Sequence, residues 1–415
     1  MNLADFRHQR VVLRITWRWL GAIAASLFLA SVPAAEMSNT ARHDFWVVDG
    51  FVFTTVVTNG VVYVGGDFRS VAPNAGRGAL LNIFSGESSP LLPQVNGAIL
   101  SVVPDGAGGW FVGGEFTAIG GFPRTNLAHI LADLKVDPAW APNAFGFTSV
   151  TQRSRIFALA RSDTALYVGG IFTNISAQSR NNLAALDLTT GAALPWNGSV
   201  TGEIYALTLQ ENRLFVGGAF NAVGGLARNH LAAVEATTGN ILPWAPVVSF
   251  IGGGGVTCFA LNGNTLYVGG DYDHINGLLR NNIAAFDLNT GDLSDWDPNA
   301  NAPLHALQFS CNTLYLAGSF TAIGGTPRNR LGAVDGQTAT PTLWNPDCNE
   351  SVFSLAIVGN TIFAGGWFDN VGGFPRTSLV AIDRETGQIT PWTANADRVV
   401  LALAAAGNYL FAGGG

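Results

Sequence analysis

Charge is scarce in this chain of 415 residues, and its positive charge is almost entirely arginine. Charged residues make up 12% of the sequence, and Lys135 is the only lysine. The formal net charge is −7, and no basic run occurs after the N-terminal segment. Because nucleic acids and anionic membranes are bound through concentrated positive charge, we expect neither as a partner.

Cysteine is nearly absent, with Cys258, Cys311 and Cys348 as its three occurrences. No C-x-x-C pair occurs, so neither a disulfide framework nor a zinc site is indicated. One disulfide could form in an oxidising compartment. Cys311 and Cys348 are, however, expected on opposite faces, and Cys258 is expected to be a buried thiol. The motifs H-E-x-x-H and G-x-S-x-G are also missing, so zinc-protease and serine-hydrolase chemistry are not indicated.

Long apolar runs are missing too, apart from one short segment near the N-terminus. Residues 20–32 are apolar, follow four arginines and precede Ala34 and Ala35. This order is typical of a secretory signal, so 1–35 is predicted to be a signal peptide and 36–44 a linker. An uncleaved anchor is the alternative, but the run is shorter than the ~20 residues that span a bilayer. The expected location is secreted, periplasmic or at the cell surface, with no transmembrane segment after cleavage.

Glycine is the residue in excess, and it marks a repeat. An aromatic residue, V-G-G, a second aromatic, an arginine, L-A-A-x-D, T-G and a tryptophan recur in that order, as in residues 264–297. The motifs begin 48 to 56 residues apart, and the longer spacings fall at 145–155 and 251–255. The first residues of the V-G-G-like pairs are Gly65, Gly113, Gly169, Gly217, Gly269, Ala317, Gly365 and Gly413. Periods of roughly 20–50 residues indicate solenoids, propellers or arrays.

Each period predicts four short antiparallel strands. The first is apolar and ends at a turn such as Asn262-Gly263, which is a strong hairpin signal. The V-G-G segment is the second strand, L-A-A-x-D the third, and the segment that ends at tryptophan the fourth. No segment after the N-terminal region has helical periodicity. The predicted fold class is therefore all-β, a β-propeller of four-stranded antiparallel blades over residues 45–415.

The number of blades depends on the two ends of the repeat region. The eighth motif reaches Gly415 before its third and fourth strands, so the sequence is interpreted as a fragment of a longer protein. Phe45 and Trp46 precede the first motif as tryptophan does elsewhere, and they are expected to supply a closing strand. The sequence leaves the number of blades at seven or eight, and eight blades with an incomplete last blade is the favoured count.

Two parts of the repeat resemble known families. The segment L-Y-V-G-G-x-F-x-x-I-G-G-x-x-R-N-x-L-A resembles the bacterial delta-60 type of propeller repeat. The pattern A-x-D-x-x-T-G-x-x-x-x-W, at 185–196 and 381–392, is similar to the tryptophan-docking repeat of PQQ-type propellers. The second resemblance implies a quinone-dependent dehydrogenase as an alternative function. That family holds its quinone under adjacent cysteines, whereas the cysteines here are far apart, so no cofactor is predicted.

One arginine in each period is the most visible polar signal. It falls in the loop between the second and third strands, so these side chains are expected on one face. They are Arg77, Arg124, Arg180, Arg228, Arg280, Arg328 and Arg376. One interpretation is an anion-binding face, and the other, favoured because every blade has the residue, is a structural bond to loop carbonyls. Asp271 and His274 lie in one such region and are the best candidates for a ligand contact, with a plain surface histidine as the alternative.

The other repeated residues are interpreted as structural. The carboxylate that ends the third strand, as in Asp187 or Asp383, is expected to accept backbone hydrogen bonds in the next turn and not to bind the arginine or calcium. The six tryptophans are expected to pack between blades, and the G-G pairs to allow blades to approach closely. No catalytic and no metal-binding residues are predicted.

A signal, a regular repeat and few catalytic groups favour a secreted, non-catalytic scaffold or binding module within a larger extracellular or surface protein. Its partner is expected to be a protein or a glycan. A carbohydrate-active propeller is a further alternative. Because function tends to break the symmetry of a repeat, the irregular loops at 145–155 and 251–255 are expected to matter more than the repeated residues.

Overall fold

The computed structural model describes residues 77–415 except 90, 147–152, 197 and 250–253, together with five strands of the preceding segment. The chain divides into two compact units, Met1–Asn74 and Ala75–Gly415. The predicted linker 36–44, and the predicted signal 1–35 apart from one strand, lie outside the described residues. Every element in the described part is a strand, so that part contains no helix capable of crossing a membrane.

The first unit holds the first repeat motif. Its strands are β1 (Val12–Leu13), β2 (Trp46–Val48), β3 (Phe51–Thr58), β4 (Val61–Asp67) and β5 (Val71–Pro73). β3 and β4 form an antiparallel hairpin with β1 on the other edge of β4, and β2 pairs with β5. Trp46 therefore belongs to a strand that pairs within this unit, and the expectation that it closes the last blade is wrong.

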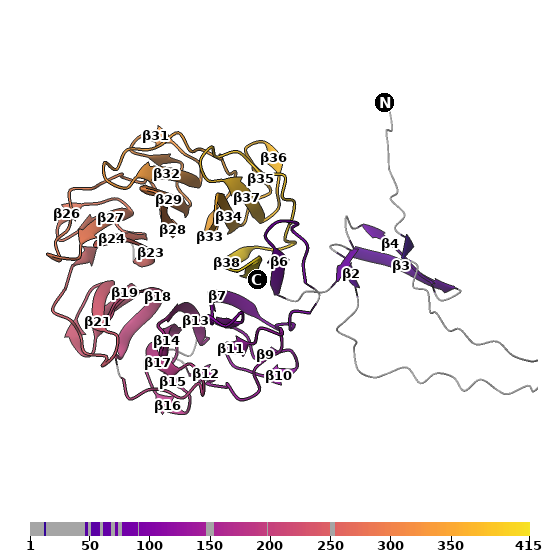
Figure 1. Ribbon diagram of the computed structural model, residues 1–415, viewed down its shortest axis with the longest axis horizontal. Coiled ribbons are helices and arrows are strands. Elements are labelled where there is room, and N and C mark those ends of the chain that lie inside the picture. Colours follow the sequence, from indigo (N-terminus) through magenta and orange to yellow (C-terminus); the bar gives the residue numbers. More distant parts are fainter. Residues whose placement is uncertain are drawn as a thin grey trace, which may run out of the picture. The chain divides into compact units, whose positions relative to one another are not determined.

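The second unit contains seven antiparallel sheets with a common core of three strands, here termed inner, middle and outer (Figure 1). The strands of each sheet are given in the order inner, middle, outer. Sheet 1 is β7 (Ala98–Pro104), β8 (Trp110–Glu115) and β11 (Leu127–Ile130), and sheet 2 is β13 (Arg155–Arg161), β14 (Ala165–Ile171) and β17 (Leu183–Asp187). Sheet 3 is β18 (Val200–Gln210), β19 (Arg213–Val223) and β21 (Leu231–Glu235), and sheet 4 is β23 (Val256–Asn262), β24 (Thr265–Gly270) and β27 (Ile283–Asp287). Sheet 5 is β28 (Leu304–Ser310), β29 (Thr313–Gly318) and β32 (Leu331–Asp335), and sheet 6 is β33 (Val352–Val358), β34 (Thr361–Gly366) and β37 (Leu379–Asp383). Sheet 7 is β38 (Val400–Ala406), β39 (Tyr409–Gly414) and β6 (Gly78–Asn82).

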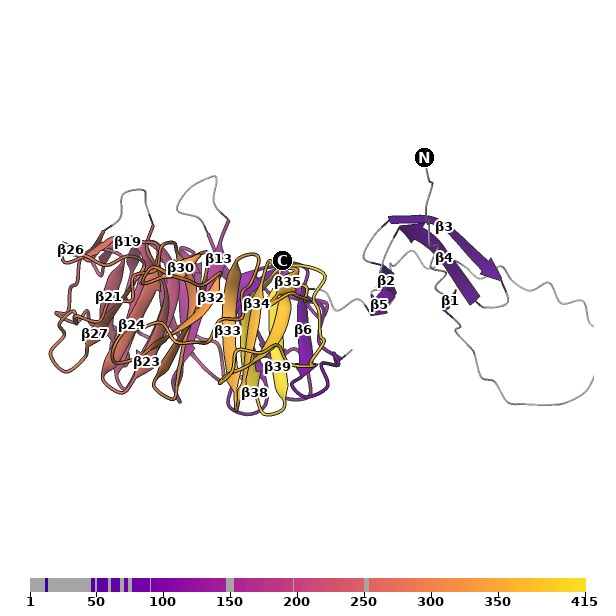
Figure 2. The ribbon, with the colours of Figure 1, turned by 90° about the horizontal axis from the view of Figure 1, so that it is seen from above.

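Most of the short strands lie in the loops between middle and outer strands. The exceptions are β12 and β22, which follow the outer strands of sheets 1 and 3 and pair with β15 and β25. The short strands form small hairpins, several of which lie toward one face of the unit in side view (Figure 2). They are β9 (Ala118–Ile119), β10 (Phe122–Pro123), β12 (Ala144–Phe145), β15 (Asn174–Ile175), β16 (Gln178–Ser179), β20 (Leu226–Ala227), β22 (Val248–Ser249), β25 (His274–Ile275), β26 (Leu278–Leu279), β30 (Ala322–Ile323), β31 (Thr326–Pro327), β35 (Asn370–Val371) and β36 (Phe374–Pro375).

Sheet 7 combines the two ends of the second unit. Its outer strand is β6, which pairs with β39 from Gly413↔Gly78 to Tyr409↔Asn82. The favoured count of eight blades assumed that the last motif lacked its outer strand, but β6 supplies that strand and gives seven sheets. The predicted fourth strand is reduced in each sheet to one bridge, such as Leu186↔Ala193 or Leu81↔Ser88.

Consecutive sheets pack through their inner strands. Each inner strand contacts the next one along the chain, and β38 also contacts β7, so the series of contacts returns to its start (Figure 1). The middle strands are buried on both faces, which explains their continuous apolar runs such as L-Y-V. Their glycines allow the close approach: a methyl group at Gly169 would lie 2.5 Å from Cγ2 of Ile204 in the next sheet. The expected close approach between sheets is therefore found at the first glycine of the pair, whereas a methyl group at the second, Gly170, would lie 2.0 Å from the carbonyl oxygen of Arg155 in the same sheet.

Candidate ligand-binding site

Each inner strand has one β-bulge at the same place. In the pairing of β13 with β14, Ile156 faces Gly170 and Ala158 faces Gly169, so Phe157 is left out of the ladder. The seven residues skipped in this way are Leu100, Phe157, Tyr205, Thr257, His305, Phe353 and Leu401. A bulge redirects a side chain and often lies beside a functional site.

The bulge residues differ in chemistry, although their neighbours repeat. A branched aliphatic residue precedes each bulge and a small residue follows it, while the bulge itself is aliphatic, aromatic, hydroxylic or imidazole. All seven are half-buried. The rings of Phe157 and Tyr205 pack edge to face with centroids 5.6 Å apart, and those of His305 and Phe353 lie 5.0 Å apart. Bulge side chains of adjacent sheets therefore form a partly exposed, mixed surface.

Hydrogen bonds fix the polar groups of this surface. The Nε2 atom of His305 lies 3.0 Å from Oγ of Ser319, which lies 2.9 Å from Oγ of Ser351. The hydroxyl of Tyr205 donates to Oε2 of Glu203 at 2.8 Å. Burial lowers the pKa of His305, and burial followed by the hydrogen bond to Glu203 raises the pKa of Tyr205. Both rings are therefore uncharged near neutral pH.

The residue after each G-G-like pair adds variable chemistry at the end of the middle strand. It is Glu115 in sheet 1, Asp271 in sheet 4, Ser319 in sheet 5 and Trp367 in sheet 6. Glu115 forms an ion pair with Arg155, in which Oε2 lies 2.7 Å from Nε. Burial raises the pKa of Asp271. The side chain of Trp367 is 71% exposed. These four residues and the seven bulge residues are here termed the bulge site.

His274, the second sequence candidate in this region, lies outside the bulge site. It begins β25, where it pairs with Ser249 and Leu279. Its Nδ1 atom contacts Oδ1 of Asp273 at 2.9 Å. Asp271 and His274 are thus placed on different elements, and a ligand contact by His274 stays a prediction.

Six of the seven arginines clamp the small hairpins to their own sheets. In each, Nη1 donates to the carbonyl of the preceding residue and Nη2 to the carbonyl fourteen positions later, as Arg228 does to Ala227 at 2.8 Å and Leu242 at 3.0 Å. The others are Arg124, Arg180, Arg280, Arg328 and Arg376. These bonds provide the structural role favoured by the sequence, and anion binding stays a prediction.

Arg77 occupies a different position from the other six. Its carbonyl accepts the N–H of Gly414 at 3.0 Å, as the carbonyl of Asn182 accepts that of Gly170. By this register Arg77 is equivalent to Asn182, two residues after the clamp Arg180. The sequence spacing grouped it with the clamps because it lies nine residues after Phe68, close to the eight residues that separate each clamp from the second aromatic residue of its motif.

The carboxylates at the ends of the outer strands organise turns, as predicted. Oδ1 of Asp187 accepts the N–H groups of Thr189 and Thr190 and the Thr190 hydroxyl. The hydrogen bond from the Thr190 hydroxyl, followed by that from its N–H, lowers the pKa of Asp187. Asp335 and Asp383 make the same contacts.

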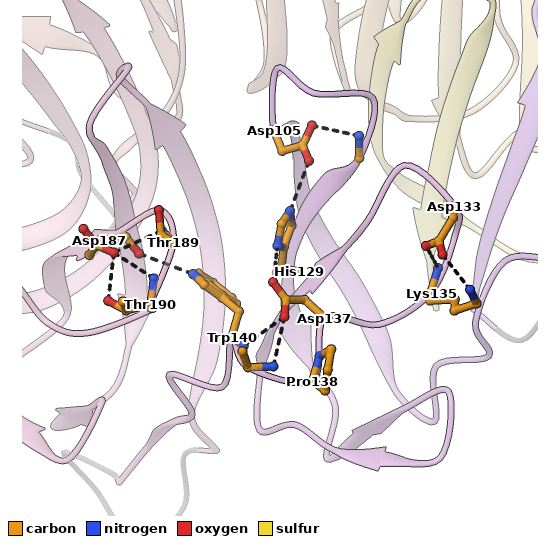
Figure 3. A network of polar contacts seen from close by, with 12 residues as sticks. Asp105, His129, Asp133, Lys135, Asp137, Pro138, Trp140, Asp187, Thr189 and Thr190 are labelled. Carbon is orange, nitrogen blue, oxygen red and sulfur yellow. Dashed lines mark hydrogen bonds and ion pairs between the residues drawn. The ribbon is translucent and has the colours of Figure 1, made fainter.

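A carboxylate–imidazole–carboxylate cluster in sheet 1 was missed from the sequence (Figure 3). His129 lies between Asp137, with Nδ1 at 3.0 Å from Oδ2, and Asp105, with Nε2 at 3.1 Å from Oδ2. Its ring stacks on Phe111. Each ring nitrogen of His129 has a carboxylate group as its partner. Since both nitrogens are engaged, the cluster ties two loop segments to β11 and presents no nitrogen to a substrate.

A departure from the repeat could have revealed this cluster. His129 stands where the L-A-A motif has alanine, as at Ala185. Burial opposes ionisation of Asp105, but the hydrogen bonds from Ala107, His129 and Gly109 outweigh it and lower its pKa. The pKa of Asp137 is also lowered, because hydrogen bonds from His129, Ala139 and Trp140 outweigh burial.

The described residues offer neither a metal site nor paired thiols. Among them, no group of three histidine, cysteine or acidic side chains is arranged to hold a metal ion. Cys258 and Cys348 are buried, Cys311 is exposed, and all three are unbridged. Burial raises the pKa of Cys258 to about 12. The quinone-binding resemblance would require adjacent cysteines, and no two cysteines are adjacent in the sequence.

Comparison with known proteins does not assign this chain to a family. No protein-family model matches the chain, and no curated protein matches it. Among solved structures, a crystal structure of the computationally designed Ika8 protein aligns with a TM-score of 0.48 and 18% sequence identity. That alignment covers 78% of this chain and 96% of the designed chain.

Proposed function

We propose that residues 75–415 form a seven-bladed β-propeller in which sheets 1–7 are the blades. Two observations support it. Inner strands contact one another in order and β38 contacts β7, and β6 completes the sheet of β38 and β39. Pairing a strand from the start of the domain with a hairpin from its end protects edges that would otherwise stay open.

We propose further that this propeller is a secreted binding module that holds its ligand at the bulge site. The observation that carries this proposal is the contrast between fixed neighbours and variable bulges, since a repeated fold needs no variation at one inner position. The N-terminal pattern of arginines, apolar run and small residues supports export. Nothing at the bulge site requires a cofactor.

Of the two expected partner classes, the bulge site favours a glycan. Phe157, Tyr205 and Phe353 present ring surfaces, and Trp367 adds an exposed indole. The uncharged His305 and Thr257 add hydrogen-bonding groups beside them. Aromatic rings with a few placed polar groups suit a ligand that has both apolar C–H faces and hydroxyls.

A glycan array probed with the full chain tests this function. The parent should bind a restricted set of oligosaccharides, and Phe157→Ala combined with Phe353→Ala should lower the signal at least about tenfold. Phe374→Ala is the matched control, because Phe374 is 51% exposed in the outlying hairpin of β35 and β36. Equal binding by the double variant and the control would overturn the proposal for the bulge site.

A further inference from the structure

Six of the seven contacts between sheets contain a tryptophan. Its indole Nε1 donates to a backbone carbonyl of the next sheet, as Trp140 does to Asp187 at 3.3 Å and Trp196 to Glu235 at 3.2 Å. The remaining four are Trp244 to Gly291, Trp296 to Asp335, Trp344 to Asp383 and Trp392 to Asn82. The predicted role of these residues in packing between blades is confirmed.

The contact between sheet 7 and sheet 1, here termed the seam, has no such tryptophan. The N–H of Ser89 donates to the carbonyl of Leu80 as that of Leu194 donates to Ala185. Trp196 stands two residues after Leu194, so Leu91 stands at the tryptophan position of the seam. Leu91 is 71% exposed, whereas Trp196 is 2% exposed.

A cavity of about 520 Å³ occupies the seam at this place. Its walls include Leu80 and Ser89 of sheet 7 and Trp110, Ala132 and Leu134 of sheet 1. By register, Leu80, Ser89 and Ala132 are equivalent to Ala185, Leu194 and Ala236. Those three residues belong to the cluster that packs around Trp196. The cavity therefore lies where the other contacts hold an indole.

Two residues of sheet 1 fill the seam only in part. Trp110 packs on Phe411 with ring centroids 5.5 Å apart, which replaces the aromatic contact that Phe111 makes with Trp140. Leu134 has a φ of 64° and stands in the turn where sheet 2 has Gly191, the glycine beside the indole of Trp140. Both still line the cavity, so they shape its walls without closing it.

We propose that the seam cavity binds a small planar aromatic molecule of indole size that carries one N–H or O–H donor. Its volume is within the range of roughly 300–1,000 Å³ typical of ligand pockets. The carbonyl of Leu131 accepts the N–H of Leu134 as that of Asp187 accepts Gly191, so it is equivalent to the carbonyl that receives an indole N–H in sheet 2. A carbonyl oxygen can accept a second hydrogen bond, and the ligand donor would supply it. This site is separate from the bulge site and does not depend on the glycan proposal.

Titration of the full chain with 5-fluoroindole, followed by ¹⁹F NMR, tests the site. A ligand of this size should bind with a Kd of roughly 0.1–1 mM. In Leu91→Trp, the new indole should enter the cavity and weaken binding at least about tenfold. Leu278→Trp is the matched control, because Leu278 is 55% exposed in the small hairpin of β25 and β26, and it should bind as the parent does.

Ala132→Phe gives a second block should Leu91→Trp fold poorly, because Ala132 is an exposed wall residue of the cavity. It should also weaken 5-fluoroindole binding at least about tenfold. The proposal is overturned if the parent shows no saturable binding up to about 5 mM. It is equally overturned if the folded blocking variants bind as tightly as the parent and Leu278→Trp.

Discussion

The seam and the six tryptophan contacts join equivalent sheets by different means. Near the G-G pairs they are alike: a methyl group at Gly413 would lie 2.5 Å from Cγ2 of Ile99 across the seam, and one at Gly169 would lie 2.5 Å from Cγ2 of Ile204. Near the turns they differ, since Trp196 lies between sheets 2 and 3 while the seam has a cavity. The close packing of inner and middle strands is thus the constant part of each contact. The indole is a separate, replaceable part.

Removing an indole should show the largest difference between the two kinds of contact. Trp196→Ala deletes a side chain that is 2% exposed and donates to Glu235, so it should cost about 3–5 kcal/mol of unfolding free energy. Leu91→Ala changes a residue that is 71% exposed and should cost under about 0.5 kcal/mol. Guanidinium unfolding of both variants makes the comparison. Similar losses in the two would mean that the seam depends on Leu91 as the other contacts depend on tryptophan.

Adding a methyl group to the middle strand should instead affect both kinds of contact equally. Gly169→Ala and Gly413→Ala each force a methyl against a buried isoleucine, and overpacking of this kind costs about 1–3 kcal/mol. Sheet 5 has Ala317 at this position, facing Val352 of the next sheet. Ala317→Gly is therefore the control and should lower the unfolding free energy by less than the other two.

Thermal and guanidinium unfolding would measure these three variants side by side. A loss at Gly169 without one at Gly413 would show that the seam is loose along its whole length. In that case the cavity would be one part of a generally weak contact and not a local replacement for an indole.

The sequence predicts the parts of the fold that repeat. The hairpin turns, the G-G pairs, the turn carboxylates such as Asp187 and the packing of tryptophan between sheets all follow from local pattern, and each is found. The partner of the last hairpin does not follow, because β39 pairs with β6 from the far end of the second unit. Each middle strand has the same sequence pattern, so the pattern alone does not show which outer strand pairs with β39.

The candidate sites were hard to predict for a related reason. A repeat draws attention to residues it shares, such as Arg228, and these form clamps within one sheet. The bulge residues are visible only when the strand register is known, because the bulge is a property of pairing. His129 and Leu91 did carry a signal, since each departs from the residue that the other periods have at its position.

The acid response of sheet 1 should give the smallest effect, and it sharpens the contrast with sheets that have alanine in place of His129. The pKa values of Asp105 and Asp137 are lowered in the folded chain. Groups of this kind stabilise the fold above their unfolded pKa of about 3.9 and lose that contribution as the pH falls through the folded value. His129→Ala removes a partner from both carboxylates, so it should destabilise the protein more at pH 6 than at pH 3. Guanidinium unfolding at both pH values checks this, with His230→Ala as control, because the Nδ1 atom of His230 contacts the Gly218 carbonyl. An equal loss at both pH values for His129→Ala would show that the ring acts through its stacking on Phe111 and not through the carboxylates.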